Sequence, residues 1–393
     1  MLLAWELGNN LGHLSRLLPL ARRLKARGHS VLVAARDVTG AARLFSHAAI
    51  PFVQAPFVAA RMDIGRQPVS HADILAGQGW GDSTSLWGVV QAWCNLLRLY
   101  RADVVVLDYA PTALIASRAQ GVPTVAIGTG FELPPSIEPL PPFPGFPGAT
   151  AQAAARAEVE VLSNANEVLQ ALGMPCENSL ARVLRPDRCF LTTFSELDHY
   201  GARADANYVG PVNALDAGNT LEWPMDSERK IFAYLRADTP SLSAILESLD
   251  QCGRGVVCYA PGVSRKDQDR HKGPSFAFSD RPVLLSSLFK ATDLCVSYAP
   301  AGFIATALMS GIPQLLSPSH VEAQLTAHRV ELLGAGLILR GPQTGTTVAR
   351  FIDTLLHTAR FRERADAFAQ QYAHSSPEAA ADRITGEIES LAA

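Results

Sequence analysis

The 393-residue sequence predicts an α/β protein with two domains, each built on a parallel β-sheet that helices cover. The chain is too long for one ordinary core and suits two domains of roughly 200 residues each. In both halves, short aliphatic runs alternate with amphipathic stretches, the pattern of parallel strands joined by helices. A polar segment with glycine and proline at positions 210–224 separates the halves. We therefore expect one domain over residues 1–209 and a second over residues 210–393.

In the first half, aliphatic runs predict strands at residues 2–5, 30–35, 103–107, 124–127 and 189–192. A helix is expected between the first two strands, because apolar residues recur there with the spacing i, i+3, i+4, i+7 and i+10. These residues are Leu14, Leu17, Leu18, Ala21 and Leu24. The basic residues of this stretch, beginning with Arg16, occupy the remaining face, and Gly28 ends the helix.

The second half repeats the scheme. Strands are expected at residues 231–235, 255–259, 294–297, 313–316 and 336–339. Helices are expected at 241–250, 302–310 and 322–333, and apolar residues at 348–356 mark the face of a further helix.

Residues 133–148 contain seven prolines, which exclude a regular helix or a central strand. Two interpretations remain open: a solvated loop, or a rigid wall over a binding site, since long loops in compact domains are often functional. The aromatic side chains of Phe143 and Phe146 favour a wall for an apolar ligand.

The composition argues against several classes of protein. With 34 basic against 37 acidic residues and a net charge of −3, the chain lacks the basic footprint of a nucleic-acid-binding protein. No apolar run reaches the roughly 18 residues of a spanning helix, and the N-terminus lacks the basic region of a signal peptide. Six widely spaced cysteines without a CxxC pair are typical of reduced thiols. We expect a cytoplasmic protein.

The turn after the first strand, residues 6–13, ends in Gly12 and His13 and lacks the GxGxxG fingerprint. His13 is either a helix residue without a chemical role or a group at the carboxyl edge of the sheet, where ligands bind in such folds. Asp108 follows the buried run 104–107 and is expected at the same edge. It could orient His13 as a base, cap the helix that begins near Pro111, or do both.

These motifs resemble the family 1 glycosyltransferases of the GT-B fold, which include plant natural-product and bacterial macrolide-type enzymes. The resemblance begins with Gly12-His13 and the helix that leads to Gly28-His29-Ser30-Val31. It continues in order through Asp108, residues 208–212 and residues 307–313. It implies two Rossmann-like domains facing a cleft, with the acceptor on the N-terminal domain and the nucleotide sugar on the C-terminal one. The final helices are expected to return to the first domain.

The resemblance also implies the chemistry. His13 would be the general base and Asp108 its partner, with Gly12 on the acceptor-side loop. An acceptor hydroxyl attacks the anomeric carbon, the nucleotide diphosphate (UDP or dTDP) leaves from the opposite face, and the configuration inverts. No cofactor and no metal are implied, because a helix N-terminus can hold a pyrophosphate. The acceptor is small or lipid-linked, so transient contact with a membrane surface is compatible with this interpretation.

The donor signature departs from the family. Tyr298-Ala299-Pro300 replaces a His-Gly-Gly stretch whose histidine contacts phosphate, and Gly302 keeps an amide at the start of the helix. Phe303 stands where the family often has a hydroxyl residue, and Thr306 stands where many members have a ribose-binding glutamate. Gln324 lies one position later than the amide that holds the sugar hydroxyls. The remaining candidates for the donor site, besides Tyr298 and Gly302, are Ala301, Glu322, which keeps a carboxylate, and Val283, in a segment that holds the base through backbone groups.

Arg236 is a candidate to compensate, because a guanidinium can bind phosphate oxygens bidentately. The alternative is a surface arginine paired with Asp238. Tyr298 could likewise donate to a phosphate or simply pack. Two other functions stay open: a glycosyltransferase-like binding protein without catalysis, and a nucleotide-sugar 2-epimerase, whose catalytic carboxylates have no recognisable counterpart here. The sequence predicts no oligomeric state.

Overall fold

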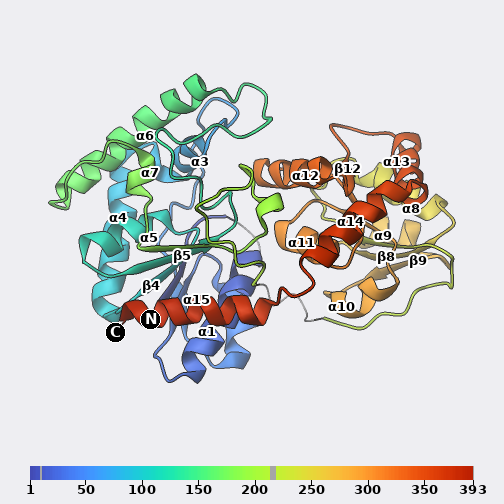
Figure 1. Cartoon of the computed structure of the whole chain (residues 1–393), viewed down its shortest axis with the longest axis horizontal. Helices are drawn as coiled ribbons and strands as arrows, with labels where there is room; N and C mark the ends of the chain where they lie inside the picture. Colours follow the sequence, from blue (N-terminus) through green and yellow to red (C-terminus); the bar gives the residue numbers. More distant parts are fainter. Residues whose placement is uncertain (9–10, 213–217, 393) are drawn as a thin grey trace. The chain divides into compact units, whose positions relative to one another are not determined.

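The computed structural model of the chain describes residues 1–8, 11–212 and 218–392. The chain divides into two compact units, Met1–Ala214 with Ser376–Ala393, and Leu215–Ser375 (Figure 1). The division falls at residues 213–217, so this part of the predicted linker lies outside the described residues. We call the two parts unit 1 and unit 2.

Unit 1 contains a six-stranded parallel sheet with the order β3-β2-β1-β4-β5-β6. Its strands are β1 (Leu2–Trp5), β2 (Leu32–Ala35), β3 (Phe52–Gln54), β4 (Val105–Asp108), β5 (Thr124–Gly128) and β6 (Arg188–Leu191). The order reverses between β1 and β4, which are neighbours although a long stretch of chain separates them. In such sheets, ligands bind beyond the carboxyl ends of the strands at this reversal.

The α-helices of unit 1 are α1 (Gly12–Ala26), α2 (Val38–Phe45), α3 (His71–Leu75), α4 (Ser83–Tyr100), α5 (Pro111–Ala119), α6 (Ala151–Ala171), α7 (Leu180–Val183) and α15 (Pro377–Ala392). Shorter helical segments are η1 (Ser46–Ala48), η2 (Ala76–Trp80) and η3 (Ser195–Leu197). The apolar face predicted for α1 is buried: Leu14, Leu17, Ala21 and Leu24 are fully inaccessible and Leu18 nearly so.

Helix α15 belongs to unit 1, as the predicted return of the chain requires. Its residues Ala381, Ile384 and Ile388 join the same core cluster as the apolar face of α1. The ends of the two helices are held by ion pairs, Arg23 to Asp382 at 2.8 Å and Arg27 to Glu389 at 2.6 Å. Figure 1 shows α15 in red running alongside α1.

Unit 2 contains the second six-stranded parallel sheet, in the order β12-β11-β10-β7-β8-β9. Its strands are β7 (Lys230–Tyr234), β8 (Gly255–Tyr259), β9 (Phe276–Ser279), β10 (Leu294–Ser297), β11 (Gln314–Leu316) and β12 (Gly336–Ile338). Its helices are α8 (Leu242–Gln251), α9 (Arg265–His271), α10 (Leu285–Leu288), η4 (Phe289–Ala291), α11 (Ala301–Met309), α12 (Val321–Leu333), α13 (Gly345–His357) and α14 (Ala359–Gln371). Here the order reverses between β7 and β10.

The two Rossmann-like sheets and the returning helix confirm the predicted fold class. Two strands were not predicted, β3 and β9, and both lie at the edge of a sheet. An edge strand is short and its side chains are only partly buried, so it lacks the continuous apolar run of a central strand. In β3, for example, all three residues are half-buried or exposed.

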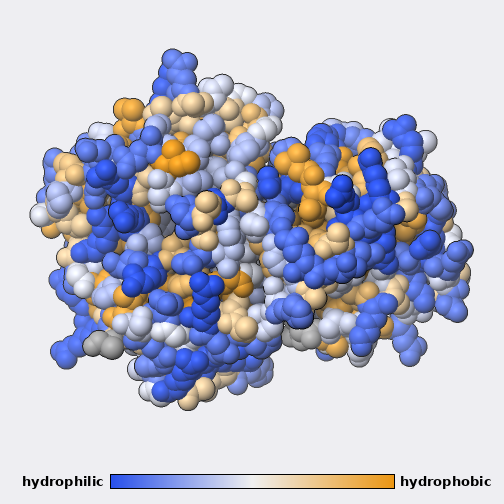
Figure 2. All heavy atoms as spheres, viewed as in Figure 1, coloured by the Kyte–Doolittle hydropathy of each residue, from blue (hydrophilic) through white to orange (hydrophobic). Residues whose placement is uncertain are grey.

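The proline-rich segment forms no helix or strand over residues 133–150, all of which are described, apart from one antiparallel bridge between Ser70 and Pro142. On the face drawn in Figure 2, hydrophobic residues form small patches separated by hydrophilic ones. Among the described helices, none is both long and apolar enough to cross a membrane.

Candidate active site

The structure brings His13 and Asp108 together at the reversal of the first sheet. Asp108 is the last residue of β4 and pairs in register with Trp5, the last residue of β1. His13 lies in the first turn of α1, which follows β1. Its Nδ1 is 2.8 Å from Oδ1 of Asp108, and the carboxylate is fully buried. Because a carboxylate accepts this hydrogen bond, Nδ1 of the neutral ring carries the proton and Nε2 has a free lone pair.

Asp108 does not cap the helix that follows it, so that alternative is wrong. Helix α5 begins after Ala110 without a side-chain cap. Instead, Oε2 of Glu6 accepts hydrogen bonds from the backbone N–H groups of Thr112 at 3.0 Å and Ala113 at 3.3 Å. Burial raises the pKa of Glu6 to about 7, although these hydrogen bonds oppose the change. Glu6 therefore accepts hydrogen bonds from the first N–H groups of α5, and the Asp108 carboxylate is available to pair with His13.

Arg16 and Glu132 complete the cluster, and sequence reasoning missed both roles. Arg16 lies on the face of α1 expected to be polar, but it is only 7% exposed. Its guanidinium donates to Oδ1 of Asp108 at 3.1 Å and to Oε1 of Glu132 at 3.2 Å. Glu132 is also 3.9 Å from Nδ1 of His13. The one available signal was the spacing of His13 and Arg16, which at i, i+3 share a helix face.

The charges around His13 shift its proton affinity. Burial lowers the pKa of His13, but the Asp108 carboxylate, its hydrogen bond and the Glu132 carboxylate outweigh burial, so the pKa is raised. Burial raises the pKa of Glu132, but the charges of Arg16 and His13 and hydrogen bonds from Thr129 outweigh it and lower the pKa to about 2. The Glu132 carboxylate is thus suited to stay ionised beside the histidine.

His13, Asp108 and Glu132 could each offer a metal one ligand atom, with the three atoms within 4.8 Å of one another. The guanidinium of Arg16 already bridges the two carboxylates, however. The positive charge of Arg16 therefore already lies between the carboxylates that a metal ion would need, and this set of side chains does not fit a metal ion.

The ring of His13 is held between aromatic neighbours and a glycine. Trp5 stacks on it with centroids 5.1 Å apart, and Tyr109 lies at 6.3 Å. Gly8 has a φ of +81°, and a Cβ at this position would lie 2.5 Å from Nε2. Only glycine therefore lets the turn approach this nitrogen so closely. Asn9 and Asn10, in the same predicted turn, lie outside the described residues, whereas Gly12 begins α1 with open space around it.

A cavity of about 90 Å³ adjoins this cluster within unit 1. Glu132 and Tyr109 line it beside His71, whose Nδ1 has no hydrogen-bond partner among the described residues. Burial lowers the pKa of His71 to about 4, so its ring is neutral at neutral pH. Pro134 and Pro135 form part of the wall. The rest of the lining is mostly apolar, and includes Leu107, Leu114, Leu133, Leu140, Ala181 and Leu184.

Phe143 and Phe146 lie in the proline-rich segment but do not line this cavity. Phe143 is fully buried and stacks on Phe131, with centroids 5.8 Å apart. Phe146 is half-buried and meets Phe143 edge-on at 6.0 Å. Pro134 and Pro135, rather than these two aromatic rings, therefore line the cavity.

In unit 2, two of the predicted donor residues, Arg236 and Tyr298, lie near the reversal between β7 and β10. Arg236 follows β7, Tyr298 follows β10, and the strands pair in register through Ser297 and Tyr234. The hydroxyl of Tyr298 donates to that of Tyr234 at 3.4 Å. The Arg236 guanidinium lies 5.5 Å from the centroid of the Tyr298 ring and pairs with Asp238 at 3.0 Å. The surface pairing considered for Arg236 is therefore present.

Helix α11 begins at Ala301 beside these residues, and its N-cap, Pro300, provides no side-chain cap. Gly302 is half-buried, whereas Phe303 is only 3% exposed and packs against Tyr234 at 5.4 Å. Thr306 donates its hydroxyl proton to the carbonyl of Gly302 within the helix. The phenyl ring of Phe303 thus belongs to a core, and only backbone amides are offered at this helix end.

The other predicted donor residues are more scattered. Glu322 is half-buried near the Tyr298 hydroxyl, whose pKa it helps to raise after the larger effect of burial. Gln324 is exposed on α12. Val283 is buried in the core cluster of unit 2, and the backbone on either side of it is paired with Asn219. Its side chain is therefore part of the core of unit 2.

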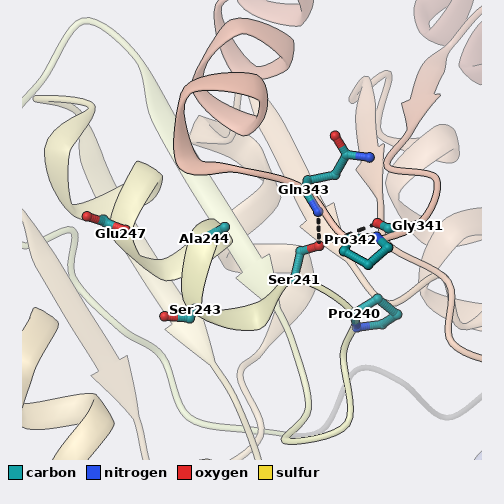
Figure 3. A pocket seen from close by; sticks show the side chains of 8 residues that line it. All are labelled: Pro240, Ser241, Ser243, Ala244, Glu247, Gly341, Pro342 and Gln343. Atoms are coloured by element: carbon teal, nitrogen blue, oxygen red, sulfur yellow. Dashed lines mark hydrogen bonds between the residues drawn. The ribbon is translucent and has the colours of Figure 1, made fainter.

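A more open pocket of about 480 Å³ lies elsewhere in unit 2, between the start of α8 and the loop after β12 (Figure 3). There the backbone N–H of Gln343 donates to the Ser241 hydroxyl at 2.8 Å. Its lining residues are Pro240, Ser241, Ser243, Ala244, Glu247, Gly341, Pro342 and Gln343. They include none of the predicted donor residues.

Comparison with known proteins finds similarity in both sequence and fold. The family model described as "Erythromycin biosynthesis protein CIII-like, C-terminal domain" matches residues 277–387. Glycosyltransferase GtfC of Amycolatopsis orientalis is 28% identical over 145 residues, which are 33% of this chain and 36% of that protein.

Solved structures extend the likeness to the whole chain. VinC in complex with dTDP has a TM-score of 0.69 at 15% identity and covers 100% of this chain and 99% of its own. The spinosyn rhamnosyltransferase SpnG with dTDP has a TM-score of 0.69 at 17% identity, covering 97% and 98%. The glycosyltransferase of kitacinnamycin has a TM-score of 0.71 at 18% identity, covering 98% of both chains. The chain therefore has the GT-B fold and is related to the antibiotic glycosyltransferases.

Proposed function

We propose that this chain is an inverting, metal-independent glycosyltransferase that moves a sugar from a dTDP-sugar to a hydroxyl of a small acceptor. The observation that carries the proposal is the buried contact between His13 and Asp108, which leaves Nε2 of His13 as a base. Relatives support dTDP over UDP as the nucleotide of the donor, and a small acceptor over a lipid-linked one. VinC and SpnG were solved with dTDP, and SpnG also with the spinosyn aglycone.

In the proposed reaction, Nε2 of His13 takes the proton of the acceptor hydroxyl as its oxygen attacks the anomeric carbon. A new C–O bond forms there, and the bond from that carbon to the diphosphate oxygen breaks. The diphosphate leaves with the bonding electrons. The imidazolium formed on His13 is stabilised by the Asp108 carboxylate at 2.8 Å. A single displacement from the opposite face inverts the configuration.

The acceptor is proposed to bind in unit 1 beside the cavity next to the His13 cluster. The lining is mostly apolar, and Pro134 and Pro135 give it a rigid wall. The neutral ring of His71 is one of the few polar groups of this lining. This combination suits an apolar molecule with a few polar groups, as small-molecule sites generally do.

The diphosphate is proposed to bind at the N-terminus of α11. The first backbone N–H groups of a helix and its dipole favour an anion, and Ala301, Gly302 and Phe303 provide them here. Arg236 could add a bidentate contact in place of the phosphate histidine of the family, because it lies at the adjoining strand end. In this assignment the guanidinium exchanges Asp238 for phosphate.

A binding protein without catalysis is the second candidate. It is favoured by the burial of Tyr298 and Phe303, which are 5% and 3% exposed where relatives have phosphate-binding groups. A thermal-shift series with dTDP, UDP, GDP, ADP and CMP separates the candidates. A nucleotide at ~100 times its Kd adds about 2.7 kcal/mol and raises Tm. Selective stabilisation by dTDP supports the enzyme, and no response from folded protein favours the second candidate.

His13→Asn then tests the base. The variant should keep the Tm of the wild type to within a few degrees, because the Asp108–Arg16–Glu132 contacts remain. Transfer from a dTDP-sugar to a panel of hydroxyl-bearing small molecules should fall by at least about 100-fold, the lower bound for general-base catalysis. Turnover at the wild-type rate in a folded variant would contradict the assignment.

A further inference from the structure

His13 is faced by two carboxylates and a guanidinium that joins them. Oδ1 of Asp108 is 2.8 Å from Nδ1, and Oε1 of Glu132 is 3.9 Å from the same nitrogen. Arg16 pairs with Asp108 at 3.1 Å and with Glu132 at 3.2 Å. The side chains of Arg16, Asp108 and Glu132 are at most 9% exposed. Their charges are therefore poorly screened by solvent or salt.

The other elements packed around the ring add no further unpaired charge from the described residues. Trp5, the last residue of β1, stacks on His13, and Glu6, which follows β1, is engaged with the start of α5. From the end of β4 comes Tyr109, and beyond it lies His71 of α3, whose ring is neutral. The net charge facing His13 is thus one negative charge, from two carboxylates and one guanidinium.

We infer that Arg16 and Glu132 form a charge-balancing pair, in which the Arg16 guanidinium offsets the Glu132 carboxylate and so limits how tightly His13 holds a proton. They are positioning residues, because each acts on His13 and Asp108 and not on a substrate. The inference rests on the proposed role of His13 as the general base.

The arrangement also fixes Asp108 in place. Glu132 accepts hydrogen bonds from the backbone N–H and the hydroxyl of Thr129, which hold its other oxygen. Glu132 in turn holds Arg16, and Arg16 donates to the same oxygen of Asp108 that accepts from His13. A guanidinium can make both contacts at once because its N–H donors form a rigid planar fork.

Removing the charge of Arg16 and removing the charge of Glu132 should change the pKa of His13 in opposite directions. In Arg16→Met two carboxylates face His13 without a balancing cation, and the proton is held more tightly. In Glu132→Gln the remaining charges cancel, and the proton is held more loosely. A charge this close changes a pKa by about one unit or more. In the double variant Arg16→Met/Glu132→Gln, Asp108 alone faces His13, and the net charge returns to that of the wild type.

The experiment measures two quantities in the full chain. The first is the acid limb of kcat/KM against pH, which reports the base in the free enzyme. The second is the titration of the His13 imidazole by NMR, assigned by the signal missing from His13→Asn. The control is Arg23→Met, which removes the same charge from the same helix but from an ion pair at its surface with Asp382. Arg23 lies ten residues along the helix from His13, a distance of roughly 15 Å.

For the wild type the acid limb should lie above pH 6.5, because the pKa of His13 is raised and the ring must be neutral to accept a proton. The limb should move up by about one pH unit or more in Arg16→Met and down by a similar amount in Glu132→Gln. In the double variant the acid limb should return to the wild-type pH, and in Arg23→Met it should not move. If Arg16→Met fails to fold, Glu132→Gln and the double variant still test the charge-balancing role.

Loss of kcat in these variants without movement of the limb, or movement in one direction for all of them, would overturn the inference. The NMR titration keeps this outcome separate from failure of the proposed function. If His13→Asn retains turnover, the function is wrong whatever the titration shows. If His13 titrates identically in all variants, the charge-balancing role is wrong even for an active glycosyltransferase.

Discussion

Replacing Gly8 by alanine tests whether Nε2 of His13 is the reacting atom. The new Cβ would lie 2.5 Å from that nitrogen, whereas ordinary contacts begin at 3.4 Å. The ring or the turn must therefore move by about 0.9 Å. A shift of this size disturbs the 2.8 Å hydrogen bond to Asp108. Misplacement of a reacting group by about 1 Å can cost 10²-fold in rate, so kcat/KM should fall about 100-fold.

Gly8→Ala also carries a cost in stability that must be separated from the loss of rate. With φ at +81°, alanine at this position costs about 1–2 kcal/mol of folding free energy. Gly28→Ala is the matched control, because Gly28 has a φ of +92° at the other end of α1 and nothing within 4 Å of a Cβ. Urea unfolding should show a similar loss in both variants, but kcat/KM should fall only in Gly8→Ala.

Two results would refute this reasoning. Wild-type kcat/KM in a folded Gly8→Ala variant would mean that the proton is not taken at Nε2. An equal loss of activity in Gly28→Ala would mean that backbone strain, and not the clash with the ring, explains the effect.

Two further predictions concern the donor site and the buried carboxyl of Glu6. Arg236→Ala should weaken dTDP binding in calorimetry by about tenfold or more, the loss expected for a charge-assisted contact, while acceptor affinity stays unchanged; equal dTDP affinity would contradict the phosphate assignment. For Glu6, the pKa of about 7 in the folded protein lies above the ordinary value of 4.5, so its stabilising contribution is full below pH 4.5 and is lost as the pH rises through 7. Glu6→Gln should therefore gain stability relative to the wild type between pH 5 and pH 8 in urea unfolding, and a constant difference would show that Glu6 is ionised throughout.

The central part of the fold could be predicted from the sequence because it depends on local patterns. Strand β4 is buried on both faces, and residues 104–107 therefore form a continuous apolar run. His13 and Asp108 follow neighbouring strand ends, and the geometry of a parallel sheet places them together. The strands β3 and β9 were not predicted; in β3 all three residues are half-buried or exposed, so no apolar run marks it.

The rest of the candidate site depends on contacts that no local pattern encodes. Arg16 looks like any arginine on a polar helix face until the loop carrying Glu132 covers it. Glu132 itself precedes the proline-rich segment, where side-chain direction cannot be read from periodicity. The capping of α5 by Glu6, 106 positions from Thr112, likewise arises only because β1 and β4 are adjacent in space.

The packing of α15 on α1 has a consequence for how the protein folds during synthesis. Unit 1 begins with the first strand of the chain, yet its core includes Ala381, Ile384 and Ile388, which the ribosome adds after the whole of unit 2. Until then the apolar face of α1 lacks part of its cover, and unit 2 can fold first although it is encoded second. The order of completion along the chain is thus opposite to the order in which the two units begin.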